Sequence, residues 1–320
     1  MGQRVGIDRL RPASRGEEPR PQAVSRPERA VGSRRRTPYY FAAPAVLFVF
    51  LGGLFMSLYA LYISFNEYQL QRRAAPRFIG LDNYIEAVKD RQLWTTIWQT
   101  LTIAAPALVL EMLVGLALAL LLNRNFRGRA LAVSLIVTPV MVSPAAAGMA
   151  WRLLLEPRYG PVNDLLSRLT GLTVQIGWLG SLSWARPSIV FTDVWHMSPF
   201  VMLLLLAGLG NISEDIYGAA KVDGASAWQT LVDITLPLLK PILVLVVLLR
   251  GIDLVRLFDL IFIMTKGGPG TVTQTLSYYI YLNGLQFFRI GYAAAMAWLV
   301  AIFFIIFAKF YLDILRKETR

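Results

Sequence analysis

Residues 97–122 read IWQTLTIAAPALVLEMLVGLALALLL, an apolar run with one charged side chain, Glu111. About 20 helical residues cross a hydrocarbon core ~30 Å thick, so this run is long enough to span a membrane. Backbone amides find no water inside lipid, and a helix satisfies them within one segment. The run therefore predicts a transmembrane α-helix.

Five further runs have a similar length and character. They are residues 41–63, 130–151, 187–209, 241–265 and 290–308. The 320-residue chain is 56% hydrophobic and 16% charged, well below the quarter that is usual for soluble domains. A membrane barrel would instead alternate apolar and polar residues over segments of about ten. We predict an all-α membrane protein with six transmembrane helices, in which prolines 106, 139, 144 and 199 kink helices or open gaps.

The distribution of positive charge predicts the orientation. The side that holds both chain ends carries 19 Lys and Arg residues, and the other side carries 11. Positive residues favour the cytoplasmic side, so both termini are expected in the cytoplasm of a bacterial inner membrane. Residues 1–36 hold ten of these cations in a Pro- and Arg-rich stretch, which predicts a disordered basic arm before a transmembrane domain at 37–320. We expect the arm to set topology or touch lipid rather than bind nucleic acid.

The sequence lacks the residues that several kinds of chemistry require. The chain has no cysteine and one histidine, His196, which excludes disulfides and thiolate metal sites and leaves little room for any metal. We find no phosphate-binding loop of the G-x-x-x-x-G-K-[ST] type and no nucleophile with a partnered base. We therefore expect no catalytic residue, no metal and no cofactor in this chain.

The longest predicted cytoplasmic loop, residues 210–240, is rich in small residues without being low in complexity. Its alanines favour helix, Gly224 suits a helix C-cap, and Pro237 is expected to interrupt the helix before the fifth span. The loop predicts a short helix, a turn and a second helix at the membrane face. This unit could cap the bundle or dock into another protein.

The stretch YGAAKVDGASAWQTLVDITLPLLKP, residues 217–241, resembles the EAA loop of binding-protein-dependent ABC transporter permeases. The resemblance implies a short coupling helix, at about 212–225, that sits in a groove of an ATPase subunit. The coupling residues it implies are Tyr217, Gly218, Ala219, Ala220, Asp223, Gly224, Ala225 and Pro237. Gly218 departs from the pattern because it replaces the usual glutamate.

Three more stretches resemble motifs of the same family. They are Phe78–Tyr84, Tyr159–Asn163 and Thr265–Pro269. Together they resemble the permeases for maltose, trehalose and glycerol phosphate, which implies sugar transport and the type I ABC importer permease fold. By that resemblance the transporter also needs a second permease, giving a heterodimer, two ATPase subunits that bind ATP and Mg²⁺, and an external solute-binding protein.

Polar residues at bilayer depth form two helical stripes. Because such groups are costly in lipid, they usually line a cavity or pair with each other. The stripes consist of Asp193, His196, Met197 and Phe200 on the fourth span, and Arg250, Asp253 and Leu254 on the fifth. Such a mixture suits a polyhydroxylated ligand. The alternative is structural pairing, for example of Arg250 with Asp253.

The family resemblance adds Val140 and Ser143, beside Pro144 on the third span, to the expected solute contacts. Glu111 has no partner visible in the sequence. One interpretation is that it forms a hydrogen bond to the second permease. A second function class, a transporter driven by an ion gradient through Asp193, Asp253 or Glu111, usually needs paired repeats and more spans. The solute could be a sugar, an oligosaccharide, a polyol or a sugar derivative.

Overall fold

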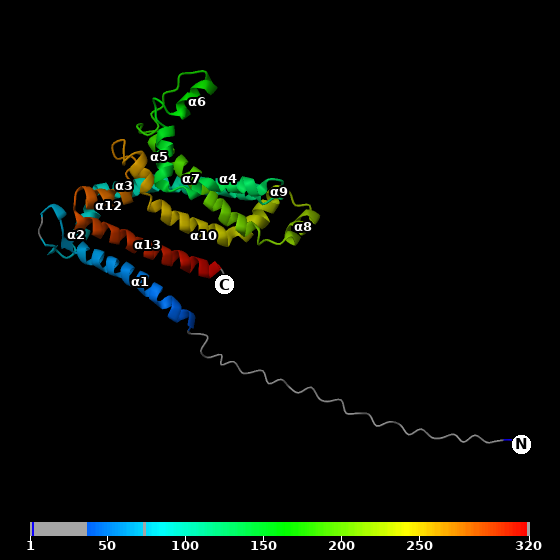
Figure 1. The fold of residues 1–320 in the computed structure, drawn as a ribbon, viewed down its shortest axis with the longest axis horizontal. Coiled ribbons are helices and arrows are strands. Elements are labelled where there is room, and N and C mark those ends of the chain that lie inside the picture. Colours follow the sequence, from blue (N-terminus) through cyan, green and yellow to red (C-terminus); the bar gives the residue numbers. More distant parts are fainter. Residues whose placement is uncertain (1, 3–36, 73–74, 319–320) are drawn as a thin grey trace. The chain divides into compact units, whose positions relative to one another are not determined.

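The computed structural model describes residues 2, 37–72 and 75–318 (Figure 1). The predicted arm, residues 1–36, lies outside them apart from residue 2. The chain divides into two compact units, Met1–Phe55 and Met56–Arg320. In the first unit the described residues form the start of helix α1, Thr37–Ser64, whose side chains from Ala42 to Phe55 are exposed.

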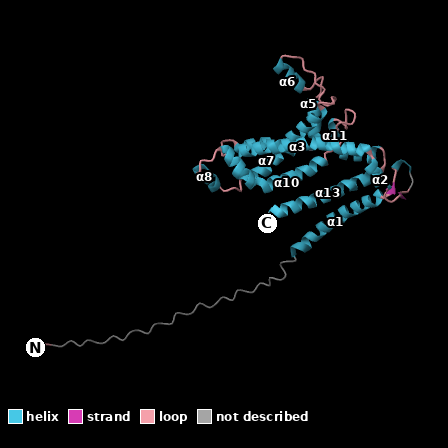
Figure 2. Cartoon of the chain, turned by 180° about the vertical axis from the view of Figure 1, so that it is seen from behind, coloured by secondary structure: helices cyan, strands magenta, loops and turns pink. Residues whose placement is uncertain are grey.

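The second unit is mostly helical, with loops between the helices (Figure 2). Its helices are α2 (Asp82–Lys89), α3 (Arg91–Leu122), α4 (Arg129–Met141), α5 (Pro144–Leu154), α6 (Pro161–Thr170), α7 (Ala185–Leu209), α8 (Glu214–Val222), α9 (Ala227–Gln229), α10 (Leu236–Val255), α11 (Asp259–Met264), α12 (Leu276–Tyr281) and α13 (Ile290–Glu318). Shorter turns are the 3-10 helix η1 (Leu70–Arg72) and the π-helices η2 (Thr230–Thr235) and η3 (Leu282–Gln286). Two short antiparallel strands, β1 (Asn66–Glu67) and β2 (Arg77–Phe78), pair near the end of α1.

Four helices of the described chain are long and apolar enough to cross a membrane. They are Ala42–Ser64, Arg91–Leu122, Ala185–Leu209 and the composite helix Ala227–Met264. The bent pair α4 and α5 makes a fifth span if it is counted as one, and the last predicted span contains the shorter apolar helix Ile290–Ile306. The all-α membrane fold is confirmed, and the count of six spans stays a prediction.

The predicted third span, 130–151, is not continuous. Helices α4 and α5 meet at an angle of 95°. Pro144 begins α5 and has no N–H to give to a preceding carbonyl, while the Ser143 side chain accepts from the Ala146 N–H and so caps the new helix. One proline and one N-cap thus turn the expected kink into a break.

Pro237 was expected to interrupt a helix, and this expectation is wrong. The helix continues from Ala227 through η2 into α10. A proline ring clashes with the carbonyl four residues earlier in an α-helix. The wider π-turn at Thr230–Thr235 precedes Pro237 directly, so the chain accommodates the ring without ending the helix.

Close contact between α3 and α7 forms the centre of the bundle. A Cβ atom on Gly115 of α3 would lie 2.6 Å from Val201 Cγ1 of α7. On the α10 side, a Cβ atom on Gly208 of α7 would lie 2.4 Å from Ile242 Cδ1. Small residues allow this approach of helices in membranes. Val201, Met202 and Leu205 of α7 are fully buried in the core that results.

A polar latch joins α3 to α12 and α13 where α3 begins. Asp90 is the N-cap of α3 and accepts from the Gln92 N–H at 2.8 Å, from Tyr279 Oη at 2.6 Å and from Tyr292 Oη at 2.7 Å. Burial raises the pKa of Asp90, but these hydrogen bonds outweigh it, so the pKa lies below its usual value. Burial and the bond to Asp90 raise the pKa of Tyr279 to about 12. The latch is therefore a carboxylate with neutral phenol donors at neutral pH.

Candidate solute site and coupling surface

Arg250 stands at the centre of a buried charge cluster that joins three helices. Its Nε lies 2.7 Å from Glu111 Oε2 and its Nη2 lies 2.8 Å from Glu111 Oε1, a bidentate pair between α10 and α3. The same Nη2 donates to Asp193 Oδ2 on α7 at 2.9 Å. Glu111, Asp193 and Arg250 are 0%, 4% and 3% exposed. We call these three residues the charge cluster.

The cluster changes the interpretation of its members. Glu111 has its partner within this chain, and Asp193 and Arg250 bind each other. Removing one partner of a buried pair leaves an uncompensated charge and typically costs about 3–5 kcal/mol. These contacts support the pairing alternative for Arg250, with Glu111 and Asp193 as its main partners. A solute contact by Asp193 or Arg250 stays a prediction.

Asp253 is the exposed edge of this arrangement. Its Oδ2 lies 3.5 Å from Arg250 Nη1, and its side chain is 54% exposed. Leu254, the next residue, was predicted to face the solute, but it is 1% exposed and packs with Ile103, Ile189 and Tyr278 in a core cluster. The helix thus turns Leu254 into the bundle of this chain, and a solute contact by Leu254 stays a prediction.

His196 lies at the break between α4 and α5. Its Nε2 is 2.9 Å from the carbonyl oxygen of Val142. A carbonyl can only accept, so Nε2 carries the proton. The imidazole thereby satisfies a backbone group next to the break, and α7 holds the bent segment in place.

The remaining predicted solute residues surround this break or follow it along α7. Ser143 is exposed, and Val140, Met197 and Phe200 are half-buried. The structure thus brings His196 next to the α4–α5 break that Ser143 caps. Solute binding by this group stays a prediction.

At the opposite end of α7, helix α8 forms an exposed projection (Figure 1). Ser213 caps its start, and Gly224 ends it with φ +74°, where the Ala225 N–H donates to the Ala220 carbonyl. The predicted short helix and its Gly224 cap are confirmed. Ala220 is the buried residue of α8, while Gly218, Ala219 and Asp223 are exposed.

The underside of α8 borders a polar cavity of about 890 Å³. Tyr217 spans its edge with a contact of 3.4 Å to Thr235 Oγ1 on η2. Arg124 and Lys221 line the same cavity, as does Gly218. No described atom lies within 4 Å of a Cβ built on Gly218, so the space left by the missing side chain is open.

Sequence reasoning missed two apolar side chains on this surface. Val222 is 87% exposed and Trp228 is 72% exposed. Both lie outside the predicted membrane spans, and large apolar residues in a loop otherwise rich in small and polar residues were the available signal. Large exposed apolar side chains on α8 and α9, outside the predicted membrane spans, suit an interaction surface.

The family model for the inner membrane component of binding-protein-dependent transport systems matches residues 111–320. The chain belongs to this family. The matched region begins at Glu111, so it contains the whole charge cluster and α8. The transport permease fold expected from the EAA-like loop is therefore confirmed.

Individual relatives cover most of this permease. A probable ABC transporter permease of Sinorhizobium fredii is 38% identical over 287 residues, 88% of this chain and 92% of the relative. The trehalose/maltose transport system permease of Thermococcus litoralis is 38% identical over 214 residues, 67% of this chain and 70% of the relative. A solved chain of a bacterial alginate ABC transporter, in complex with an alginate pentasaccharide-bound periplasmic protein, aligns with a TM-score of 0.77 and 25% identity. That alignment covers 90% of this permease and 96% of the solved chain.

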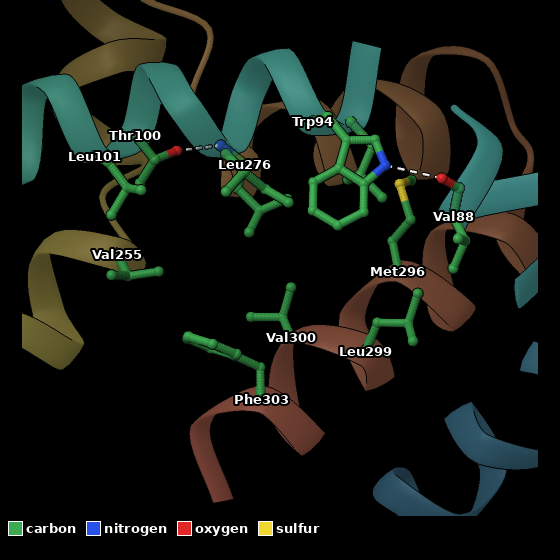
Figure 3. A pocket seen from close by; sticks show the side chains of 12 residues that line it. Val88, Trp94, Thr100, Leu101, Val255, Leu276, Met296, Leu299, Val300 and Phe303 are labelled. Carbon is green, nitrogen blue, oxygen red and sulfur yellow. Dashed lines mark hydrogen bonds between the residues drawn. The ribbon is translucent and has the colours of Figure 1, made fainter. Parts of the chain in front are cut away.

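A cavity of about 320 Å³ between α3 and α13 does not suit a hydroxylated solute (Figure 3). Its walls are mainly aliphatic, and its side-chain polar groups are already bonded. Trp94 Nε1 donates to the Val88 carbonyl at 2.8 Å, and Thr100 Oγ1 accepts from the Leu276 N–H at 2.9 Å. A sugar entering it would lose hydrogen bonds to water without replacing them.

Proposed function

We propose that this chain is one permease subunit of an ATP-driven importer for a carbohydrate-like solute. The observation that carries the proposal is α8, a capped helix that projects from the bundle with an exposed apolar and small-residue surface. Such a surface suits the cleft of an energy-supplying partner. The carbohydrate class is supported by the trehalose/maltose relative and the alginate structure.

The partners follow from what the chain lacks. Its sequence holds no phosphate-binding loop. ATP and Mg²⁺ therefore bind to two separate ATPase subunits, and residues 212–225 couple them to the permease. A second permease completes the translocation path as a heterodimer, and an external solute-binding protein delivers the solute. The permease itself has no catalytic role.

The solute path runs past the α4–α5 break. A break in a membrane helix exposes backbone and polar side chains where a solute can reach them. Ser143, Met197, Phe200 and Asp253 are candidate contacts because the structure leaves them exposed or half-buried. Buried His196 joins them because it bonds the backbone at the break itself. Asp193 and Arg250 hold these helices in register.

The transporter lies in a bacterial inner membrane with both termini in the cytoplasm, as the distribution of Lys and Arg indicates. The basic arm sets this topology. Deleting residues 2–30 leaves Arg34, Arg35 and Arg36 in place.

The proposal is tested by reconstituting the chain with its cognate permease, ATPases and binding protein in liposomes. We expect uptake that needs ATP and an ATPase activity stimulated by the loaded binding protein. The matched control is the chain alone under a proton gradient. Uptake by the chain alone, independent of ATP, would support a gradient-driven transporter and overturn the proposal.

A further inference from the structure

Four aromatic rings converge on a second cavity, at the end of α7 opposite α8. Trp151 of α5, Trp178 and Trp184 of the α6–α7 connection, and Phe191 of α7 line a space of about 520 Å³. We call this the aromatic cavity. Its volume lies within the ~300–1,000 Å³ that is usual for small-molecule sites. Rings from three separate segments facing one space differ from a belt of outward-facing tryptophans.

The rings are held in fixed orientations. Trp178 Nε1 donates to Asn163 Oδ1 at 2.8 Å, and buried Asn163 in turn donates to the Ile176 carbonyl at 3.0 Å. Trp178 meets Trp184 edge to face at 5.0 Å between ring centroids, and Trp151 meets Phe191 in the same way at 5.0 Å. Aromatic pairs of this geometry are favourable beyond their buried area. The cavity wall is therefore preorganised before any ligand arrives.

The three indole N–H groups around the cavity differ in whether they are bonded. Among the described residues, the indole N–H groups of Trp151 and Trp184 have no acceptor. This distinguishes the aromatic cavity from the cavity between α3 and α13, where the Trp94 N–H is already bonded. Aromatic faces match the flat C–H face of a pyranose ring, whose hydroxyls lie at its edge.

The rings continue toward the predicted solute residues. Phe191 and Trp195 are one helical turn apart on α7, and both are partly exposed. Trp195 meets Trp151 at 5.5 Å. The next residue, His196, bonds the Val142 carbonyl at the α4–α5 break. The contact between Trp151 and Trp195 thus extends the row of rings one turn along α7 beyond the cavity.

We infer that the aromatic cavity is a stacking subsite for a pyranose ring on its way to the α4–α5 break. This inference rests on the proposed function and narrows its substrate class. A linear polyol has no flat C–H face, so it gains little from the rings. The permease therefore favours pyranose-containing solutes over linear polyols.

Replacing rings by aliphatic groups tests the inference in the assembled transporter. Phe191→Leu keeps most of the apolar volume but removes the stacking face, Trp184→Leu removes the face together with part of the volume, and Phe191→Tyr keeps a ring. We expect each Leu variant to raise the KM for a pyranose solute about three- to tenfold, and the Tyr variant to change it less than twofold. Trp98→Leu, at an exposed ring on α3, is the matched control with no change expected.

The ATPase activity stimulated by the binding protein is measured beside uptake, because it reports assembly and coupling. Unchanged KM values in both Leu variants, with ATPase stimulation intact, overturn the stacking subsite and leave the proposed function standing. Equal losses for a pyranose and for a linear polyol that the same transporter carries also overturn it. If no loaded binding protein stimulates the ATPase even with the unsubstituted chain, the proposed function itself fails.

Discussion

The charge cluster and the α8 surface lie in opposite environments within the same fold. Arg250 is enclosed by the carboxylates of Glu111 and Asp193, so the cluster is satisfied within the chain. Val222 at the end of α8 and Trp228 on α9 stay exposed, and Gly218 of α8 lines an open cavity. The first region is complete and holds helices together, while the second is incomplete and presents a surface to a partner.

Breaking the charge cluster should have the largest effect. Arg250→Met leaves Glu111 and Asp193 facing each other as buried carboxylates, and we expect a loss of about 3–5 kcal/mol in folding free energy. Thermal unfolding of the detergent-solubilised permease measures this loss. Arg256→Met, at an exposed arginine six residues later, is the matched control.

A second variant tests whether the stability lost in Arg250→Met comes from the two carboxylates left unpaired. Replacing all three members by neutral residues of similar size, Glu111→Gln with Asp193→Asn and Arg250→Gln, should recover part of the lost stability. Normal stability in Arg250→Met would show that the cluster does not hold α3, α7 and α10 together.

Asp253→Asn examines the exposed edge of the cluster. The bond to Arg250 is long and partly solvated, so we expect a stability change below about 1 kcal/mol. A charge-assisted bond to a sugar hydroxyl is worth about 1.5–3 kcal/mol, so uptake should become roughly ten- to a hundredfold less efficient. Initial uptake rates in assembled transporters provide the measurement. The control is Asp259→Asn, which changes another exposed aspartate beyond α10. Equal uptake rates in the two variants would exclude Asp253 from the solute path.

The contrast between the charge cluster and the α8 surface also explains how much of the structure could be predicted from the sequence. Hydropathy found the apolar helices, and the Gly224 cap was predictable because only a few residues adopt positive φ cheaply. Helical spacing, however, compares residues within one helix. It could suggest Arg250 with Asp253, but Glu111 lies 139 residues away from Arg250 on another helix. The true partner depends on packing that no local pattern contains.

The same limit applies to the helix breaks. Pro144 and Pro237 look alike in sequence, yet one begins a new helix at 95° and the other sits inside a continuous helix. Ser143 gives the first break a cap, and η2 gives the second proline room. A proline's effect depends on whether the preceding turn can widen, which the sequence alone does not specify.

The α8 surface is tested by placing a charge on its apolar edge. Val222→Glu should leave stability unchanged because the side chain is 87% exposed. Losing one apolar anchor of an interface typically costs more than about 1 kcal/mol, so ATPase attachment should weaken by about tenfold. Co-purification of the ATPases measures this. Leu169→Glu, 75% exposed on α6, is the matched control, and undiminished attachment in Val222→Glu would exclude this edge from the interface.

Gly218→Glu tests whether the open cavity under α8 can hold the glutamate side chain that the family pattern expects. Its effect on uptake should be the smallest of those predicted here. The new Cβ meets no described atom within 4 Å, and Lys221 follows at i+3 while Arg124 lines the same cavity. Glutamate is a better helix former than glycine by roughly 0.5–1 kcal/mol, and a partly exposed ion pair adds at most about 1 kcal/mol. We therefore expect slightly higher thermal stability and uptake within about threefold of the unsubstituted permease. Gly218→Ala supplies the helix propensity without the charge, so any difference between the two variants belongs to the carboxylate. If Glu lowers uptake more than tenfold while Ala does not, the cavity is filled by a partner in the assembled transporter, and Gly218 is there to admit that partner.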